Sequence, residues 1–538
     1  MRKPRNRLGA GLGAVVVGVI ALAGCSSADE EEATPTTEAA QEPVRFAVET
    51  PDHLIPGNHF ASYNIVEALW APLVQLDENG DVSFLAAESV ESDDAVTWTV
   101  TLRDGWTFHN GDPVTAQDYV DTWNYAAYAP NAWVNAGQLA NIVGYDETSP
   151  LEGEPTAETL SGLTVVDDLT FTVELENPDR QYPLQLTIGQ TALYPLPSEA
   201  FDDLEAFEAD PIGNGPFKAS SSWTPDAPLE TVAYEDYAGP EPTVDAITFV
   251  PYIDTTVAYT DALAGEVDIV GIAAAQAQQA RTDFPDHLYE LDAPGVDFLG
   301  FNIEDPRFSD IRVRQAISMA IDREAINDAV FGGSQIPATS LTSPSMPGDP
   351  AGICGEYCEF DPEAAKALLD EAGGFEGTME ILFVANWGQE DLFEAIANQI
   401  RQNLGIEDVV PTPAADWAAF TDQVMSGDVN GPFRARWGAL YPSQQNTLQA
   451  VYTAEGEGNF GAGGYSEPEV DALIAEANAA ETAEASYEGY TAVQERILED
   501  FPTIPLFGNR YLYVTSERIA GLHTVSGAPD LTQIQLAS

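Results

Sequence analysis

Residues 98–123 read WTVTLRDGWTFHNGDPVTAQDYVDTW and carry the clearest structural signals of the chain. Apolar and polar residues alternate over the first part, as they do in a half-buried strand. Asn110-Gly111 favours a tight turn of the kind found in hairpins. Thr115 is followed three residues later by Asp118, which is close to the capping box that begins a helix. The segment therefore predicts a strand, a turn and an amphipathic helix in succession.

The rest of the body repeats this mixture. Alternation indicates further strands within 45–49 and 163–175. Helical periodicity predicts helices in five segments, 115–128, 310–331, 361–373, 391–405 and 466–481. No short repeat is present, so this order indicates a multi-lobed α/β body. Roughly 490 residues outside the N-terminal region are enough to build several cores.

The start of the chain has the features of an export signal. Residues 1–7, MRKPRNR, carry four positive charges, and a short apolar run follows. That run is shorter than the roughly 20 apolar residues of a transmembrane helix. It ends in Leu22-Ala23-Gly24-Cys25, which resembles a bacterial lipobox, where the cysteine thiol takes a diacylglycerol. The alternative is an ordinary secretory signal with a chance cysteine.

We expect residues 1–24 to be removed as a signal peptide and Cys25 to be lipidated. Residues 25–44 are acidic and rich in Thr, Ala and Pro, which is typical of a disordered tether. The mature protein is then anchored by lipid on the extracytoplasmic face of the cell membrane.

The chain is strongly acidic, with 20 Lys+Arg against 88 Asp+Glu and a formal net charge of −68. Loss of the four positive charges in the signal would take it to −72. Binding to phosphates needs a basic face, so nucleic acid is excluded as a partner. The charge is expected to keep the surface solvated.

Cys354 and Cys358 are the two cysteines left after lipidation of Cys25, and they lie close together in GICGEYCEFD. In an oxidising compartment this spacing favours a local disulfide. Zinc would need two more ligands nearby, but the five histidines are scattered along the sequence and no second cysteine pair exists. We therefore predict neither a metal nor a cofactor.

Catalytic signatures are also missing from the sequence. It contains no G-x-S-x-G elbow, no H-E-x-x-H and no Walker loop. Carboxylate pairs are frequent in a chain with 88 acids, so their presence carries little information. The prediction is a binding protein without enzymatic activity. A cell-surface hydrolase is the alternative, because carboxylate spacing in three dimensions decides glycosidase activity.

Six segments together resemble one known family, in that family's order along the chain. They are residues 98–123, 210–223, 258–271, 301–324, 436–448 and 497–507. The chain resembles the extracytoplasmic solute-binding proteins of ABC transporters, in the oligopeptide/dipeptide-binding family 5, over nearly all of residues 45–520. The resemblance implies a class II periplasmic-binding-protein-like α/β fold, with two lobes, a hinge and an inserted third subdomain.

The same resemblance implies the division of the body. Lobe I is expected to be discontinuous, over 45–82, 205–293 and 505–538. The inserted subdomain would occupy 83–204 and lobe II 294–504. The implied partners are an ABC permease and its ATPase subunits, and the binding protein itself would act as a monomer.

The family also implies a ligand site around FRARWGALYPS, residues 433–443. Tryptophans matching Trp417 and Trp437 line the family's cavity, and the arginine matching Arg434 can meet a peptide carboxylate. We place Arg436 on the opposite face of the strand and expect it to be solvated. Gly438 and Tyr441 complete the predicted site, together with the residue between them.

That residue, Leu440, departs from the family pattern, which has an aspartate there for the ligand's α-amino group. A buried ammonium without a counter-charge costs on the order of 3–5 kcal/mol. Either another acid substitutes, or the ligand lacks a free amine at this point. An oligopeptide is the first expectation. The alternatives are an N-blocked or cyclic peptide, an oligosaccharide, a siderophore or a metal chelate, or a lipoprotein that senses peptides without importing them.

Overall fold

The computed structural model describes residues 41–59, 63–77, 80–187, 194–525 and 527–537. The predicted signal peptide, Cys25 and the tether up to residue 40 lie outside these ranges. From Gln41 onward the chain forms one compact unit. Within the described ranges, none of the helices combines the length and the apolar character that crossing a bilayer requires.

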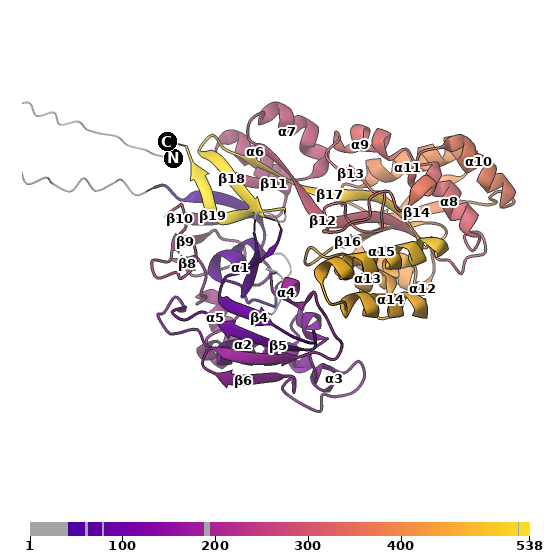
Figure 1. Cartoon of the computed structure of the whole chain (residues 1–538). Helices are drawn as coiled ribbons and strands as arrows, with labels where there is room; N and C mark the ends of the chain where they lie inside the picture. Colours follow the sequence, from indigo (N-terminus) through magenta and orange to yellow (C-terminus); the bar gives the residue numbers. More distant parts are fainter. Residues whose placement is uncertain (1–40, 60–62, 78–79, 188–193, 526, 538) are drawn as a thin grey trace, which may run out of the picture. The chain divides into compact units, whose positions relative to one another are not determined.

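A mixed sheet of eleven strands runs through the described body (Figure 1). Its order is β15 (Val409–Ala414), β14 (Met379–Val384), β16 (Phe433–Gly438), β12 (Leu288–Gly300), β17 (Thr503–Thr515), β11 (Ile269–Ile272), β1 (Val44–Glu49), β10 (Ala246–Tyr252), β9 (Leu229–Ala233) and β8 (Phe217–Ala219). β13 (Ile336–Pro337) pairs with β17 outside this path. The predicted strand at 45–49 is confirmed as β1.

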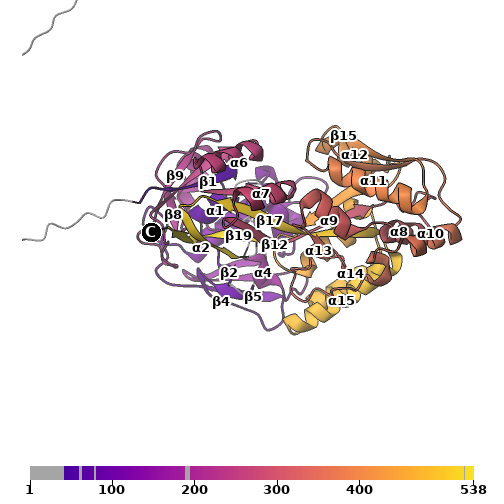
Figure 2. The ribbon, with the colours of Figure 1, turned by 90° about the horizontal axis from the view of Figure 1, so that it is seen from above.

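The two longest strands of this sheet, β12 and β17, pair antiparallel from Leu288 opposite Val514 to Gly300 opposite Thr503. Figures 1 and 2 show them running from the portion that contains β1, β10 and β11 to the portion that contains β14 and β16. Their register is irregular between Asp292 and Val296. The lobe boundaries predicted at 293/294 and 504/505 fall inside these two strands, and the division itself stays a prediction.

A second sheet, in the order β4-β5-β7-β6, contains the strand predicted within residues 98–123. The strands are β4 (Ala87–Glu91), β5 (Thr97–Leu102), β7 (Thr170–Glu174) and β6 (Leu163–Asp167). The predicted helix follows as α2 (Ala116–Ala127), and both the amide and the hydroxyl of Thr115 donate to Asp118 Oδ2, at 2.8 and 2.7 Å. The strand, the turn and the helix predicted from residues 98–123 are confirmed.

Two small hairpins complete the strands. β2 (Val74–Leu76) pairs with β3 (Val82–Phe84), and β18 (Ile519–Val525) pairs with β19 (Ala528–Leu536). The helices before residue 284 also include α1 (Tyr63–Leu69), α4 (Tyr182–Gln185), α5 (Leu204–Ala209), α6 (Thr255–Ala264) and α7 (Ala277–Asp283). α3 (Tyr145–Thr148) is a single turn. Figure 1 shows β18 and β19 beside β1 and α1, at the left of the view.

The helices that flank the other half of the large sheet come from the second half of the chain. They are α8 (Ile311–Met319), α9 (Arg323–Phe331), α10 (Pro362–Glu371), α11 (Glu390–Leu404), α12 (Trp417–Ser426), α13 (Gln444–Tyr452), α14 (Pro468–Asn478) and α15 (Ala483–Asp500). The helix predicted over 310–331 is wrong as a single element, because the chain divides it into α8 and α9. The side chain of Asp322 accepts from the amide of Ala325 and so begins the second helix.

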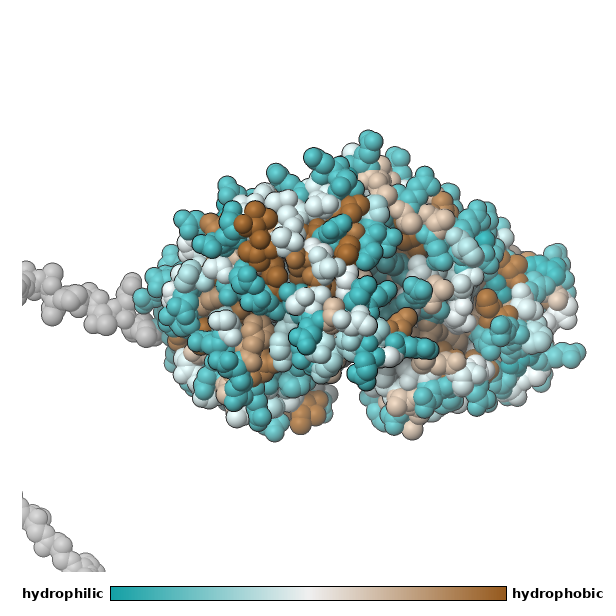
Figure 3. All heavy atoms as spheres, turned by 90° about the horizontal axis from the view of Figure 1, so that it is seen from below, coloured by the Kyte–Doolittle hydropathy of each residue, from teal (hydrophilic) through white to brown (hydrophobic). Residues whose placement is uncertain are grey.

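The disulfide expected between Cys354 and Cys358 is present, with the two Cα atoms 5.6 Å apart. The exterior is consistent with the acidic composition. The face seen in Figure 3 is covered mainly by hydrophilic side chains, with apolar residues in smaller patches between them.

Candidate functional site

The predicted site begins on β16, an interior strand of the large sheet. β16 pairs with β12 so that Arg434 lies opposite Leu299 and Arg436 opposite Asp297. Side chains two residues apart on a strand share a face, so the prediction that Arg434 and Arg436 point to opposite faces is wrong. Arg436 is nevertheless exposed, as expected, with its Nε 3.9 Å from Asp297 Oδ1. The two arginines differ because of what covers them.

Arg434 is buried, with only 9% of its surface exposed, beneath two tryptophans. Its guanidinium carbon lies 5.2 Å from the ring centroid of Trp387 and 5.9 Å from that of Trp417. Among the described residues, no carboxylate lies within ion-pair distance of it, and its Nε has no hydrogen-bond partner. Burial lowers the pKa of Arg434 to about 10, so the group still carries its charge at neutral pH.

A buried guanidinium without an anion is energetically unfavourable, and its free N–H groups match the geometry of a carboxylate. The open donor on Arg434 is therefore the clearest sign of a ligand contact on this face of the sheet.

The rings above Arg434 form a stack that continues into helix α12. Trp387 and Trp417 lie 5.4 Å apart with an interplanar angle of 13°, and Trp417 stacks on Phe420 at the same distance. Phe460 meets Trp417 edge-on. Asp416 positions Trp417 by accepting from the amide of Ala419 at the start of α12. Trp387 and Trp417 are 50% and 40% exposed, so they present apolar area to a ligand.

Trp437 has a different environment from Trp417. Its indole Nε1 donates to Asn446 Oδ1 at 2.8 Å, and the same oxygen accepts from the amide of Leu440. A Cβ on Gly458 would lie 2.6 Å from the Trp437 ring, so the ring packs directly on that glycine. Trp437 thus fixes the end of β16 against α13. Gly438, the next residue, is exposed, and a Cβ there would meet no atom within 4 Å.

Leu440 and Tyr441 lie where three parts of the chain meet. They belong to a small apolar cluster with Leu76, Leu184 and Val525. Burial raises the pKa of the Tyr441 phenol, whose hydroxyl donates to Gln445 Oε1 at 2.9 Å. Gln445 Nε2 in turn donates to Asp179 Oδ2 at 2.9 Å, which joins α13 to the segment before α4.

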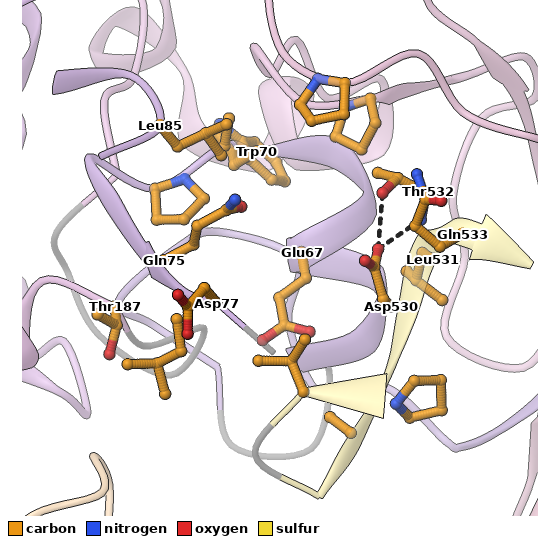
Figure 4. A pocket seen from close by; sticks show the side chains of 18 of the residues that line it. Glu67, Trp70, Gln75, Asp77, Leu85, Thr187, Asp530, Leu531, Thr532 and Gln533 are labelled. Atoms are coloured by element: carbon orange, nitrogen blue, oxygen red, sulfur yellow. Dashed lines mark hydrogen bonds between the residues drawn. The ribbon is translucent and has the colours of Figure 1, made fainter. Parts of the chain in front are cut away.

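Leu440 and Tyr441 also line a cavity of about 390 Å³, which Figure 4 shows from close by. It is bounded by α1, by the β18–β19 hairpin and by Pro294 in the irregular part of β12. Trp70 and Tyr194 contribute aromatic surface to the wall of the cavity. Figure 4 shows Glu67 projecting from α1 into the space between Asp77 and Asp530. Within the described ranges, no group of three His, Cys, Asp or Glu side chains is placed to hold a metal ion.

Comparison with known families follows this geometry. The family model described as "Bacterial extracellular solute-binding proteins, family 5 Middle" matches residues 82–459. The chain belongs to the family 5 solute-binding proteins. A curated relative is the periplasmic murein peptide-binding protein MppA of Escherichia coli, 26% identical over 486 residues, with 87% of each chain covered. Another is the periplasmic oligopeptide-binding protein OppA of Haemophilus influenzae, 27% identical over 463 residues, with 82% of this chain and 83% of the relative covered.

The fold of this family 5 protein agrees with solved structures of the same kind. The unliganded open form of the murein tripeptide-binding protein MppA superimposes with a TM-score of 0.77 and 24% identity, covering 93% of this chain and 98% of that one. The predicted fold class is confirmed.

The six predicted site residues of the family 5 protein fall into two groups. Trp417 and Arg434 contact one another, whereas Leu440 and Tyr441 line the cavity beside α1. Trp437 and Gly438 lie between these groups at the end of β16. Two residues were missing from the prediction. Trp387 comes three residues after the end of the buried strand β14, and Glu67 is a lone acid in the apolar run YNIVEALW. These patterns are weak signals that gain meaning only from the fold.

Proposed function

We propose that this protein captures peptides outside the cytoplasmic membrane and delivers them to the permease and ATPase subunits of an ABC importer. Its relatives named as murein peptide-binding and oligopeptide-binding proteins match 82–87% of the chain, which supports this ligand class. The proposal includes attachment through a lipid on Cys25, action as a monomer and no catalytic step.

One observation carries the proposal. Arg434 is a buried cation whose Nε has no hydrogen-bond partner, and two partly exposed tryptophans cover it. A peptide's terminal carboxylate would supply the missing anion, and the rings of Trp387 and Trp417 would cover apolar parts of its side chains. The open space beside Gly438 lets a ligand backbone approach β16 without a steric clash.

The test is the identity of the natural ligand. The full-length protein is purified from its membrane, and native mass spectrometry compares its mass before and after mild denaturation. A released mass that fragments into amino acids and binds again in calorimetry supports the proposal. A released sugar, lipid or metal chelate that rebinds while peptide libraries do not would overturn it.

A further inference from the structure

The cavity beside Leu440 lies next to the predicted ligand site and has the size of a ligand pocket. Leu440 and Tyr441 form part of its wall, so a ligand that runs along the end of β16 would meet this space next. Its volume of about 390 Å³ lies within the range of small-molecule sites, roughly 300–1,000 Å³. Most of the wall is apolar, which makes the charged groups in it informative.

Glu67 is the charged group that stands out in this wall. It lies on α1 among the buried apolar residues Ile65, Val66, Ala68 and Leu69. Among the described residues it makes neither a hydrogen bond nor an ion pair. Burial raises the pKa of Glu67 to about 7, and the negative charge of Asp530 adds to the effect. The side chain is half-buried and faces the cavity, and among the described residues its carboxylate has no counter-charge.

The other acids of the cavity have protein partners. Asp530 Oδ1 accepts from the amide and the hydroxyl of Thr532, and its Oδ2 lies 3.4 Å from His523 Nδ1. Asp77 accepts from the amide of Asp81 at 3.0 Å. Those hydrogen bonds stabilise turns of the protein itself, whereas the carboxylate of Glu67 makes no hydrogen bond to any described residue.

Two buried polar groups in the same wall also lack partners. Trp70 is fully buried and Tyr194 is 1% exposed, yet the Trp70 Nε1 and the Tyr194 hydroxyl form no hydrogen bond. Buried polar groups in native proteins are nearly always satisfied, so two unpaired donors on residues of the same wall are unusual and set this wall apart. A ligand group that fits this wall must donate to the carboxylate of Glu67.

We propose that Glu67 binds an ammonium group of the ligand and so supplies the acid that position 440 lacks. The inference rests on the proposed peptide-binding function, which it makes more specific. The first residue of a peptide offers the required chemistry, because its ammonium donates to a carboxylate. A lysine side chain offers the same ammonium, so the shared ligand chemistry is a primary ammonium in an otherwise apolar cavity.

The arrangement also accounts for Leu440. The leucine packs with Leu76, Leu184, Tyr441 and Val525, where an aspartate would be buried against apolar side chains. The negative charge lies instead across the cavity on α1, and the cluster around Leu440 excludes water from one side of the ammonium. An ion pair shielded in this way is stronger than one in solvent.

The experiment compares two pools of random pentapeptides prepared without lysine, one with free amino termini and one N-acetylated. Wild-type protein, Glu67→Gln and the exposed control Glu88→Gln are equilibrated with each pool, and bound members are counted by native mass spectrometry. We expect wild-type and Glu88→Gln to retain free-amine members at least tenfold better than acetylated ones. Glu67→Gln should lose that preference while binding acetylated members as well as wild-type does.

An unchanged free-amine preference in Glu67→Gln would overturn the role of Glu67 and leave peptide binding intact. If wild-type retains both pools equally, or neither, a third pool, N-acetylated and containing lysine, separates the two sources of the ammonium. Equal retention of that third pool by wild-type and Glu67→Gln would overturn the role of Glu67. Binding of that pool that depends on Glu67 assigns the site to a side chain. Failure of all three pools overturns this inference together with the proposed function.

Discussion

Gln445 donates its side-chain N–H to Asp179 over 2.9 Å, and this bond joins helix α13 to the segment that precedes α4. Asp179 is 4% exposed and also accepts from Gln185 and from the amide of Gln181. Burial raises the pKa of this carboxyl, while the three donors oppose the shift. The relationship ties the predicted site at Tyr441 to the part of the chain that carries the four-stranded sheet.

Replacing Asp179 by alanine is expected to lower the free energy of unfolding by about 2–3 kcal/mol, because buried donors lose their acceptor. Urea unfolding followed by circular dichroism measures the change. Glu176→Ala, an exposed acid three residues earlier, is the matched control and should change stability by less than about 0.5 kcal/mol. Equal effects of the two substitutions would show that the bond contributes nothing.

Arg434→Gln should weaken binding of peptides with a free carboxyl terminus by roughly 30-fold or more, equivalent to about 2–5 kcal/mol for a broken buried charge pair. C-amidated peptides should be affected much less. Arg436→Gln, on the same face of β16 but exposed, is the control and should leave both peptide classes unchanged. Calorimetry on both variants decides the matter, and equal losses in Arg434→Gln for free and amidated peptides would contradict the carboxylate role.

Trp387→Ala should reduce affinity for the same peptides by roughly threefold to tenfold, since an aromatic contact with the ligand contributes about 0.5–1.5 kcal/mol. Trp387→Phe keeps a ring over Arg434 and is expected to retain most of the affinity. Titration by intrinsic fluorescence suits this comparison, because Trp387 and Trp417 are exposed before ligand binds. An alanine variant that binds like the phenylalanine variant would show that the ring is not used.

Binding of a primary ammonium should strengthen as pH rises through 7. Glu67 binds a cation only when ionised, and burial holds its pKa at about 7 in the empty protein, so each unit below that value should weaken binding up to roughly tenfold. The ligand's own amino group stays charged below about pH 7.7. Calorimetry at pH 5.5 to 7.5, repeated in buffers of different ionisation enthalpy, should also show proton release.

Other titratable groups near Glu67 could contribute to such a profile. They are Asp77, His523, Asp530, Tyr63, Tyr194 and Tyr513. Burial raises the pKa of the three tyrosines beyond the range tested, and Glu67→Gln distinguishes Glu67 from the rest. A profile that persists in Glu67→Gln would assign the proton to another group.

Cys25→Ser is expected to move the protein from the membrane fraction to the soluble fraction, because the serine hydroxyl cannot take the diacylglycerol that a lipobox cysteine accepts. Fractionation of the producing cells followed by immunoblotting measures this. The control is Ser26→Ala, which leaves the thiol in place. Unchanged membrane association of Cys25→Ser would show that Cys25 is not the anchor.

Local features of the fold could be predicted from the sequence, and the site only in part. The capping box at Thr115 and the strand before it depend on neighbours within a few residues, and both formed as expected. The division of 310–331 into two helices was missed because periodicity continues across Asp322, whose capping role competes with it. Arg436 was wrongly placed on the face opposite Arg434, although residues two apart on a strand share a face.

Non-local contacts explain what was missed at the site. Arg434 could be selected from its resemblance to family members, but its burial depends on Trp387, which lies 47 positions earlier in the sequence. Glu67 and Leu440 line the same cavity, whose walls come from widely separated segments of the chain. No pattern along the sequence shows that a carboxylate on α1 shares a space with the residue that departs from the family pattern.

The pairing of β12 with β17 has a consequence for how the body unfolds. β12 and β17 are neighbours in the middle of the large sheet, and each also pairs with a strand on its other side, β12 with β16 and β17 with β11. Unfolding of either portion would break the hydrogen bonds between β12 and β17, on which both portions depend. We therefore expect the two halves to unfold together, so that damage to the aromatic stack over Arg434 also lowers the melting temperature of the distant half.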